Sequence, residues 1–141
     1  MNSLGRLFSA STMSLQSVLD VILGITPVPG LSAAFTLLKL IVTSVQKVRE
    51  GRRQLEVLAN SIAHLLEALN AEFSASSLVP SACVRPLQDL YSLLNDIQSF
   101  VQEGQERSFW KALFAQDSII PEIDGFYRRI DALANALFRP Y

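Results

Sequence analysis

The side chains that could carry out catalysis are few in this chain and badly placed for it. His64 is the only histidine and Cys83 the only cysteine among 141 residues. No adjacent nucleophile, acid partner or second metal ligand accompanies His64. Di-metal sites in helical bundles need glutamates and histidines that face inward, whereas the carboxylates closest to forming pairs lie off the apolar positions. These carboxylates are Asp89 with Asp96 and Glu103 with Glu106. We therefore predict no catalytic residue, no metal site and no cofactor, and an enzyme stays only a formal alternative.

The sequence is better suited to binding anions, because several basic residues are grouped in one short stretch. The group consists of Lys47, Arg49, Arg52 and Arg53. Each cation near an anionic lipid headgroup gains on the order of 1 kcal/mol, so the group predicts recruitment to an anionic membrane surface. Glu50 and Glu56 dilute the charge, and a solvated helix end with ordinary ion pairs remains the alternative. The net charge of −1 shows none of the basic excess of a nucleic-acid binder, so we expect no nucleic-acid partner.

A stretch of unusually apolar sequence lies just before this basic group. Residues 31–45 read LSAAFTLLKLIVTSV, with apolar residues all around the helix. Such a helix is either enclosed by a bundle or destined for a bilayer. With Lys39 inside, the stretch is too short for a constitutive span of about 20 apolar residues. Joined to residues 18–25 through a double-proline bend, it makes a nearly uncharged region that enters a membrane only after rearrangement. Burial at the centre of a bundle is the alternative. The candidates for insertion are Val18, Ile22, Leu31, Phe35, Leu37, Leu38 and Ile41.

The elements that position these residues are indicated by a ladder of apolar residues in alternating steps of four and three. The ladder runs from Ala34 to Phe73 with one polar member, Arg52, beside Gly51. This spacing lines up one face of a helix. Two helices over about 31–49 and 52–73, hinged at Gly51, explain it better than one long rod, which would leave its stripe in water without a partner chain. The sequence leaves the rod open.

The remaining segments predict two further long helices and two short ones. A third long helix is expected to begin near Pro86 and to continue to Val101, and a last one covers about 119–137. A short connecting helix at 109–114 precedes the last one. Residues 14–24 form an accessory helix, packed or mobile, and residues 1–13 are a flexible N-terminus.

The predicted fold is all-α, an antiparallel four-helix bundle with these two short helices added. Residues 14–141 form a single domain whose core bundle covers 31–138. The residues expected in its core occupy the apolar positions of the helices. They are Leu55, Ile62, Leu66, Leu69, Leu90, Leu94, Ile97, Phe109, Trp110, Ile123, Phe126, Ile130 and Leu133.

Composition limits the setting and the class of function. Half of the residues are hydrophobic and 18% are charged, against about 25% charged in an average soluble domain. Such a chain tends toward partners or membranes. A lone cysteine forms no internal disulfide, and the N-terminus lacks a convincing signal peptide, so we expect a reducing, cytoplasmic setting.

The C-terminal half resembles the N-terminal four-helix bundle of mixed lineage kinase domain-like (MLKL) proteins. The resemblance rests on a helix ending in Phe100, a spacer, the aromatic step from Phe109-Trp110 to Asp117, and then residues 120–137. The entry Pro29-Gly30-Leu31-Ser32 before an apolar helix is similar still more closely to the HeLo-like domains at the front of fungal kinases and nucleotide-binding receptors. The resemblance covers about residues 27–138. Its motifs are patterns of apolar spacing.

This resemblance implies a cell-death (necroptosis-like) module. Such a bundle oligomerises when an attached kinase or nucleotide-binding domain releases it, binds anionic phospholipids through basic residues, and permeabilises the plasma membrane. The matching lipid contacts here are the four basic residues of 47–53. The accessory helix departs from the animal family, and these 141 residues contain no kinase or nucleotide-binding domain. The alternative function is a non-enzymatic adaptor that self-associates or docks a partner protein through exposed apolar surface.

Overall fold

The computed structural model describes residues 20, 24–48, 51–104 and 121–138. Within these ranges the chain is all-helical and contains no strand, which confirms the predicted fold class for this part of the protein. The long helices are α3 (Ser32–Gln46), α4 (Arg52–Ser74), α5 (Val84–Gly104) and α7 (Pro121–Phe138), and two 3-10 turns are η1 (Pro29–Leu31) and η2 (Pro80–Cys83). The connecting helix with Phe109 and Trp110, the N-terminus at 1–13 and most of the accessory helix at 14–24 lie outside the described residues.

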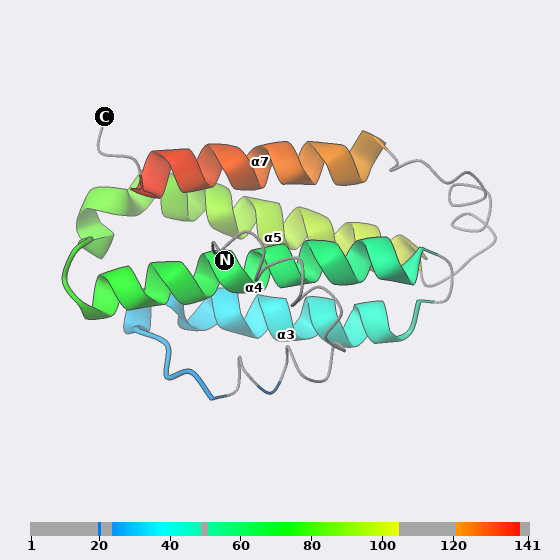
Figure 1. Ribbon diagram of the computed structural model, residues 1–141, viewed down its shortest axis with the longest axis horizontal. Helices are drawn as coiled ribbons and strands as arrows, with labels where there is room; N and C mark the ends of the chain where they lie inside the picture. The colour runs from blue at the N-terminus through cyan, green and yellow to red at the C-terminus, as the bar shows by residue number, and fades with distance from the viewer. Residues whose placement is uncertain (1–19, 21–23, 49–50, 105–120, 139–141) are drawn as a thin grey trace, which may run out of the picture.

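The four long helices lie side by side, and the colour of each successive helix in Figure 1 runs in the direction opposite to the one before. Helix α3 contacts both α4 and α5, and α7 contacts the same two helices from elsewhere on the bundle. The junction of α3 with α4 therefore lies at one end of the molecule, and the connection from α4 to α5 lies at the other (Figure 1).

The start of α3 follows from the double-proline bend. Val28 is extended, with φ −65° and ψ 155°, as expected for a residue before proline. The amide of Leu31 then donates to the carbonyl of Val28 at 2.9 Å and closes the η1 turn. At the other end α3 stops at Gln46, three residues before the predicted end, where the amide of Lys47 donates to the carbonyl of Ser44.

The ladder is divided between two helices, as the hinge interpretation predicts, and is not one rod. Gly51 adopts a left-handed backbone conformation with φ 70° and ψ 13°, which glycine reaches without a Cβ clash. The first helical hydrogen bond of α4 follows directly, from the amide of Leu55 to the carbonyl of Gly51 at 3.2 Å. Helix α4 therefore begins at a turn after α3, and the two helices lie side by side and in contact (Figure 1).

The third long helix begins near Pro86, as predicted. Helix α5 starts at Val84, directly after η2. A proline in the first turn of a helix lacks only an amide that has no helical acceptor there, so Pro86 does not mark the boundary. Helix α7 likewise has Pro121 at its first described position, followed by Glu122 and Asp124 in a first turn that favours acidic groups.

The core is a continuous apolar cluster between the four helices. Every predicted core residue that the structure describes is buried, with at most 8% of its surface exposed. These residues are Leu55, Ile62, Leu66, Leu69, Leu90, Leu94, Ile97, Ile123, Phe126, Ile130 and Leu133. At the α5–α7 contact, the rings of Phe100 and Phe126 meet edge to face with centroids 5.5 Å apart.

Candidate functional site

The candidate site is α3 together with the turn that precedes it and the basic residues that follow it. Pro29–Gln46 is an 18-residue stretch with a mean hydropathy of 1.2, and 44% of it is buried inside the bundle. Among the described residues, it alone is long and apolar enough to cross a membrane by length and composition. The core helix of a soluble protein meets the same criterion. The position of its polar residues is therefore the more informative property.

Most insertion candidates on η1 and α3 face the core. Leu31, Phe35, Leu38 and Ile41 are at most 3% exposed, whereas Leu37 is half-buried and packs against the edge of the core. Val18 and Ile22 lie outside the described residues. The apolar side of α3 is thus inside the bundle, and it includes Ala34, Leu38 and Ile41, which the ladder had placed on one face.

The outward side of α3 carries most of its polar residues. Ser32, Thr36 and Thr43 are exposed and Lys39 is half-buried. Two of the hydroxyls are satisfied within the helix: Thr36 donates to the carbonyl of Ser32 at 3.1 Å, and Thr43 donates to the carbonyl of Lys39 at 2.9 Å. Hydroxyls that donate in this way need no acceptor outside the helix. Leu40, next to Lys39 in the sequence, is 49% exposed. The sequence pattern did not identify Leu40 as a surface residue.

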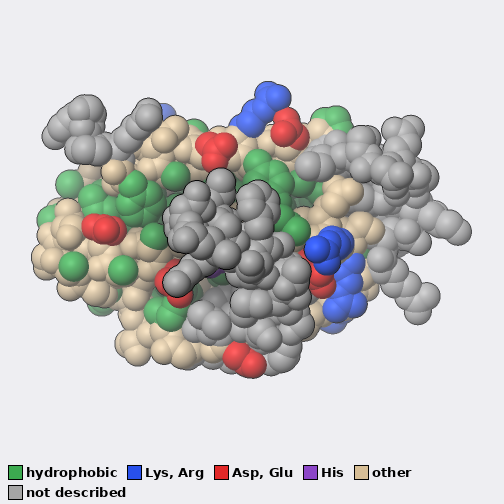
Figure 2. All heavy atoms as spheres, in the orientation of Figure 1, with side chains coloured by type: hydrophobic (Ala, Val, Ile, Leu, Met, Phe, Trp, Pro, Cys, Tyr) green, Lys and Arg blue, Asp and Glu red, His purple; other side chains and the backbone are tan. Residues whose placement is uncertain are grey.

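The basic residues lie where α3 meets α4. Lys47, Arg52 and Arg53 are exposed, and we call these three residues the basic end. Arg49 lies outside the described residues. Figure 2 shows Lys and Arg side chains gathered on this side of the molecule, with an acidic group beside them. The Nε of Arg52 lies 3.3 Å from a carboxylate oxygen of Glu56, so this cation is partly neutralised. Among the described residues, neither Lys47 nor Arg53 forms a salt bridge of this kind.

The start of α4 adds positive potential to the basic end. Its first turn contains no acidic residue, and no side chain caps it. The amides before Leu55 precede the first helical hydrogen bond, and the positive end of the helix dipole lies there. Two arginines at this position are unfavourable for the isolated helix. An anion bound nearby would relieve that repulsion.

Two side chains from other helices hold the double-proline bend, and sequence reasoning missed both. The Oδ1 of buried Asn70 accepts from the amide of Val28 at 2.8 Å, and its Nδ2 donates to the carbonyl of Thr26 at 3.3 Å. The hydroxyl of Tyr91 donates to the carbonyl of Gly30 at 3.0 Å. Asn70 follows the buried Leu69 on α4, and Tyr91 follows the buried Leu90 on α5. Their partners lie 42 to 61 residues away along the chain, so no local pattern could have identified them.

A buried polar contact also joins α3 to α5 near the basic end. The Nε2 of Gln98 donates to the hydroxyl of Ser44 at 3.3 Å, and Ser44 is only 8% exposed. The Oε1 of Gln98 is buried without a hydrogen-bond partner. An unsatisfied buried acceptor costs free energy, so this contact holds α3 less firmly than apolar packing would.

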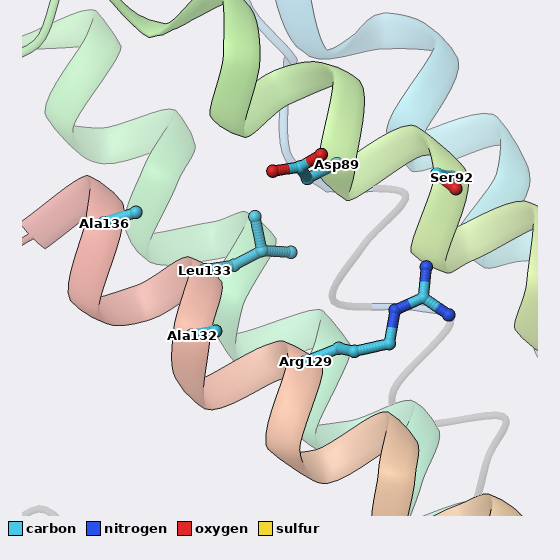
Figure 3. A pocket seen from close by; sticks show the side chains of 6 residues that line it. All are labelled: Asp89, Ser92, Arg129, Ala132, Leu133 and Ala136. Atoms are coloured by element: carbon cyan, nitrogen blue, oxygen red, sulfur yellow. The ribbon is translucent and has the colours of Figure 1, made fainter.

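The hollow between α5 and α7 does not have the properties of a catalytic site. Its volume is about 200 Å³, below the range of about 300–1,000 Å³ that is usual for ligand pockets. Figure 3 shows Asp89 and Ser92 on α5 facing Arg129, Leu133 and two alanines on α7. The guanidinium of Arg129 is already paired with Asp96 at 2.8 Å. Within the described ranges no three His, Cys, Asp or Glu residues come together as metal ligands.

The two residues of greatest intrinsic reactivity lie apart from this hollow. His64 is half-buried on α4, and Cys83 is buried in η2. No protein-family model, curated protein or solved structure matches this chain.

Proposed function

We propose that this protein is an antiparallel four-helix bundle, with short accessory and connecting helices, that binds anionic membranes and permeabilises them as an oligomer. In this proposal the chain is a cell-death module of the MLKL and HeLo-like kind, cytoplasmic at rest and recruited to the plasma membrane on activation. A regulatory kinase or nucleotide-binding domain in the full-length protein would control the change. The observation that carries the proposal is the direct succession of a span-length apolar helix, Pro29–Gln46, and the basic end.

The energetics of α3 support a role for lipid in its release. The large buried apolar residues of α3 and of the η1 turn before it are Leu31, Phe35, Leu38, Ile41, Val42 and Val45. At about 1.5–3 kcal/mol each, moving all six into water would cost roughly 10–20 kcal/mol. That exceeds or equals the whole stability of a typical domain, about 5–15 kcal/mol. Helix α3 therefore leaves the bundle only if it can pack into hydrocarbon or against another apolar surface. By binding anionic headgroups, the basic end would hold α3 close to the membrane hydrocarbon.

The length of the segment fits a bilayer. Eighteen helical residues are about 27 Å long, close to the hydrocarbon thickness of about 30 Å. The flanking charges are also suitable, because the basic end follows the segment directly and α3 contains no acidic residue. Cations at the end of an apolar helix remain with the anionic headgroups after the helix has entered.

Dye release tests the proposal on vesicles of phosphatidylcholine with and without phosphatidylserine. We expect leakage from the anionic vesicles and its loss in Leu37→Glu, because a carboxylate at mid-membrane opposes insertion of α3. Leu37 is only half-buried, so this change damages the resting bundle less than a charge at the fully buried Ile41 would.

Leu87→Glu is the matched control, because Leu87 is a half-buried leucine packed against the same core from α5. The proposal requires the control to leak like the parent protein once both variants are shown to be folded by circular dichroism. Equal loss in the two variants would mean that general destabilisation explains the effect. No leakage from the parent protein in any oligomeric state would reject the proposed function.

A second candidate function is supported by the other end of the molecule. Val79 and Val84 are each 54% exposed, and Phe138 is 37% exposed. Figure 1 places the α4–α5 connection and the C-terminal end of α7 at this same end, away from the basic end. Exposed apolar groups of this kind suit an adaptor that docks a protein partner. A discrete oligomer in light scattering, with no binding to vesicles, would favour this function over the first.

A further inference from the structure

The polar residues of α3 form a single stripe along the helix. Ser32, Thr36, Lys39 and Thr43 follow one another in steps of four, three and four. At about 100° per residue these four positions fall within a sector of roughly 60°. The structure places this sector on the outer side of α3, opposite the side that fills the core. The stripe is therefore a property of the helix as folded as well as of its sequence.

Insertion into a bilayer would reverse the requirements on the two sides. The core-facing side carries large apolar residues such as Leu38 and Ile41, which hydrocarbon accepts in place of the bundle core. The stripe holds Lys39 near the middle of the Pro29–Gln46 segment. A charged side chain at that depth is tolerated where it faces a water-filled space or a bundle interior. Several copies of α3 with their stripes turned toward one another provide such a space.

We propose that Lys39 determines the ion selectivity of this permeation path. The inference rests on the proposed function and adds a property that permeabilisation alone does not require. Copies of Lys39 form a ring of positive charge near the centre of the path, and rings of lysine or arginine select anions. The path therefore conducts small anions such as chloride in preference to potassium.

The neighbours of Lys39 leave this charge uncompensated. Thr36 and Thr43 lie on the same stripe on either side and line the path with neutral, wettable groups, because their hydroxyl protons stay on helix carbonyls. Helix α3 contains no Asp or Glu. No acidic residue of the segment is therefore available to form an ion pair with Lys39 inside the membrane.

The test measures reversal potential in a potassium chloride gradient across planar bilayers of phosphatidylcholine and phosphatidylserine. The parent protein is expected to give a chloride-to-potassium permeability ratio above one. Lys39→Glu is expected to invert the ratio to below one, and Lys39→Gln to bring it near one while conductance persists. Arg128→Glu is the control for net charge, since Arg128 is exposed on α7 and outside the stripe; its ratio is expected to match that of the parent protein.

The outcomes separate this inference from the proposed function. Conductance with an unchanged ratio in both Lys39 variants overturns the role of Lys39 and leaves permeabilisation standing. A change of equal size in Arg128→Glu overturns it as well, because a diffuse charge effect would then explain the ratio. Absence of conductance from the folded parent protein overturns both proposals together. The neutral Lys39→Gln variant keeps the inference testable where the carboxylate of Lys39→Glu blocks insertion.

Discussion

At the scale of single residues, Asn70 shows how one buried polar group fixes a feature that backbone bonding leaves open. The double-proline bend has lost two amide donors, and Val28 supplies the only amide between the two prolines. Asn70 accepts from that amide and donates to the carbonyl of Thr26. One side chain on α4 thereby sets the position from which η1 and α3 begin.

Substitution of Asn70 tests this role through stability. Asn70→Leu removes both hydrogen bonds, which are only part-buried, so we expect a loss of about 0.5–1.5 kcal/mol for each. Asn70→Asp keeps the acceptor for the amide of Val28, but it buries a carboxylate that faces the carbonyl of Thr26, so we expect it to lose stability as well. Urea unfolding measures both. Asn95→Leu, at an exposed position on α5, is expected to change stability by at most about 0.5 kcal/mol. Equal stability of Asn70→Leu and the parent protein would contradict the role.

Tyr127 gives stability a dependence on pH in the alkaline range. Burial raises the pKa of Tyr127 above 10.0, and a hydrogen bond with the Ser61 side chain opposes part of that rise. The unfolded chain loses this proton near pH 10 while the folded protein still holds it, so unfolding becomes easier as pH increases beyond that point. Below about pH 9 the group contributes no slope.

We expect Tyr127→Phe to unfold with a shallower loss of stability between about pH 9.5 and pH 11 than the parent protein. Urea midpoints measured across this interval provide the comparison. A constant offset between the two proteins reflects the lost contact with Ser61 and carries no information about ionisation. Parallel curves over the whole interval would show that Tyr127 does not contribute to the alkaline decline.

At the scale of elements, the sequence predicted what local periodicity controls and missed what distant contacts control. The spacing of apolar residues on α4, α5 and α7 identified buried residues such as Leu66, Ile97 and Ile130, because one face of each helix must leave water. Gly51 identified the joint between α3 and α4. Helix α5 starts near Pro86, as predicted, with the proline inside its first turn. On α3 the ladder identified buried residues such as Leu38 and Ile41, but the outward side was not recognised, because it consists of hydroxyls and one lysine.

At the scale of the whole molecule, the basic end and the exposed residues Val79 and Val84 lie at opposite ends. The basic end contains Lys47 and Arg53, whereas Val79 and Val84 belong to the end where α4 connects to α5. A net charge of −1 conceals this polarity, because the other charges are spread over the surface in pairs such as Arg128 with Asp124. Approach to an anionic surface is therefore expected with the α3–α4 junction leading.

Charge reversal at the two ends tests this orientation. Lys47→Glu with Arg53→Glu removes two cations from the basic end, worth on the order of 1 kcal/mol each at an anionic surface. We expect affinity for phosphatidylserine vesicles to fall by about 30-fold or more in a sedimentation assay at low salt. The matched control is Arg85→Glu with Arg128→Glu, which makes the same change in net charge at exposed positions on α5 and α7. Equal weakening by the two pairs would contradict a leading basic end.

The joint at Gly51 interrupts the helix but does not change the spacing of the apolar residues on its two sides. Val45 and Val48 before it and Leu55 after it keep the alternation of three and four residues, with Arg52 filling the intermediate step. If that joint straightened, Ser32–Ser74 would form one helix of about 65 Å with a continuous apolar stripe. That length is more than twice the thickness of the hydrocarbon layer. A change in the backbone torsion angles at this joint would therefore convert two helices that lie side by side into one continuous helix about twice as long.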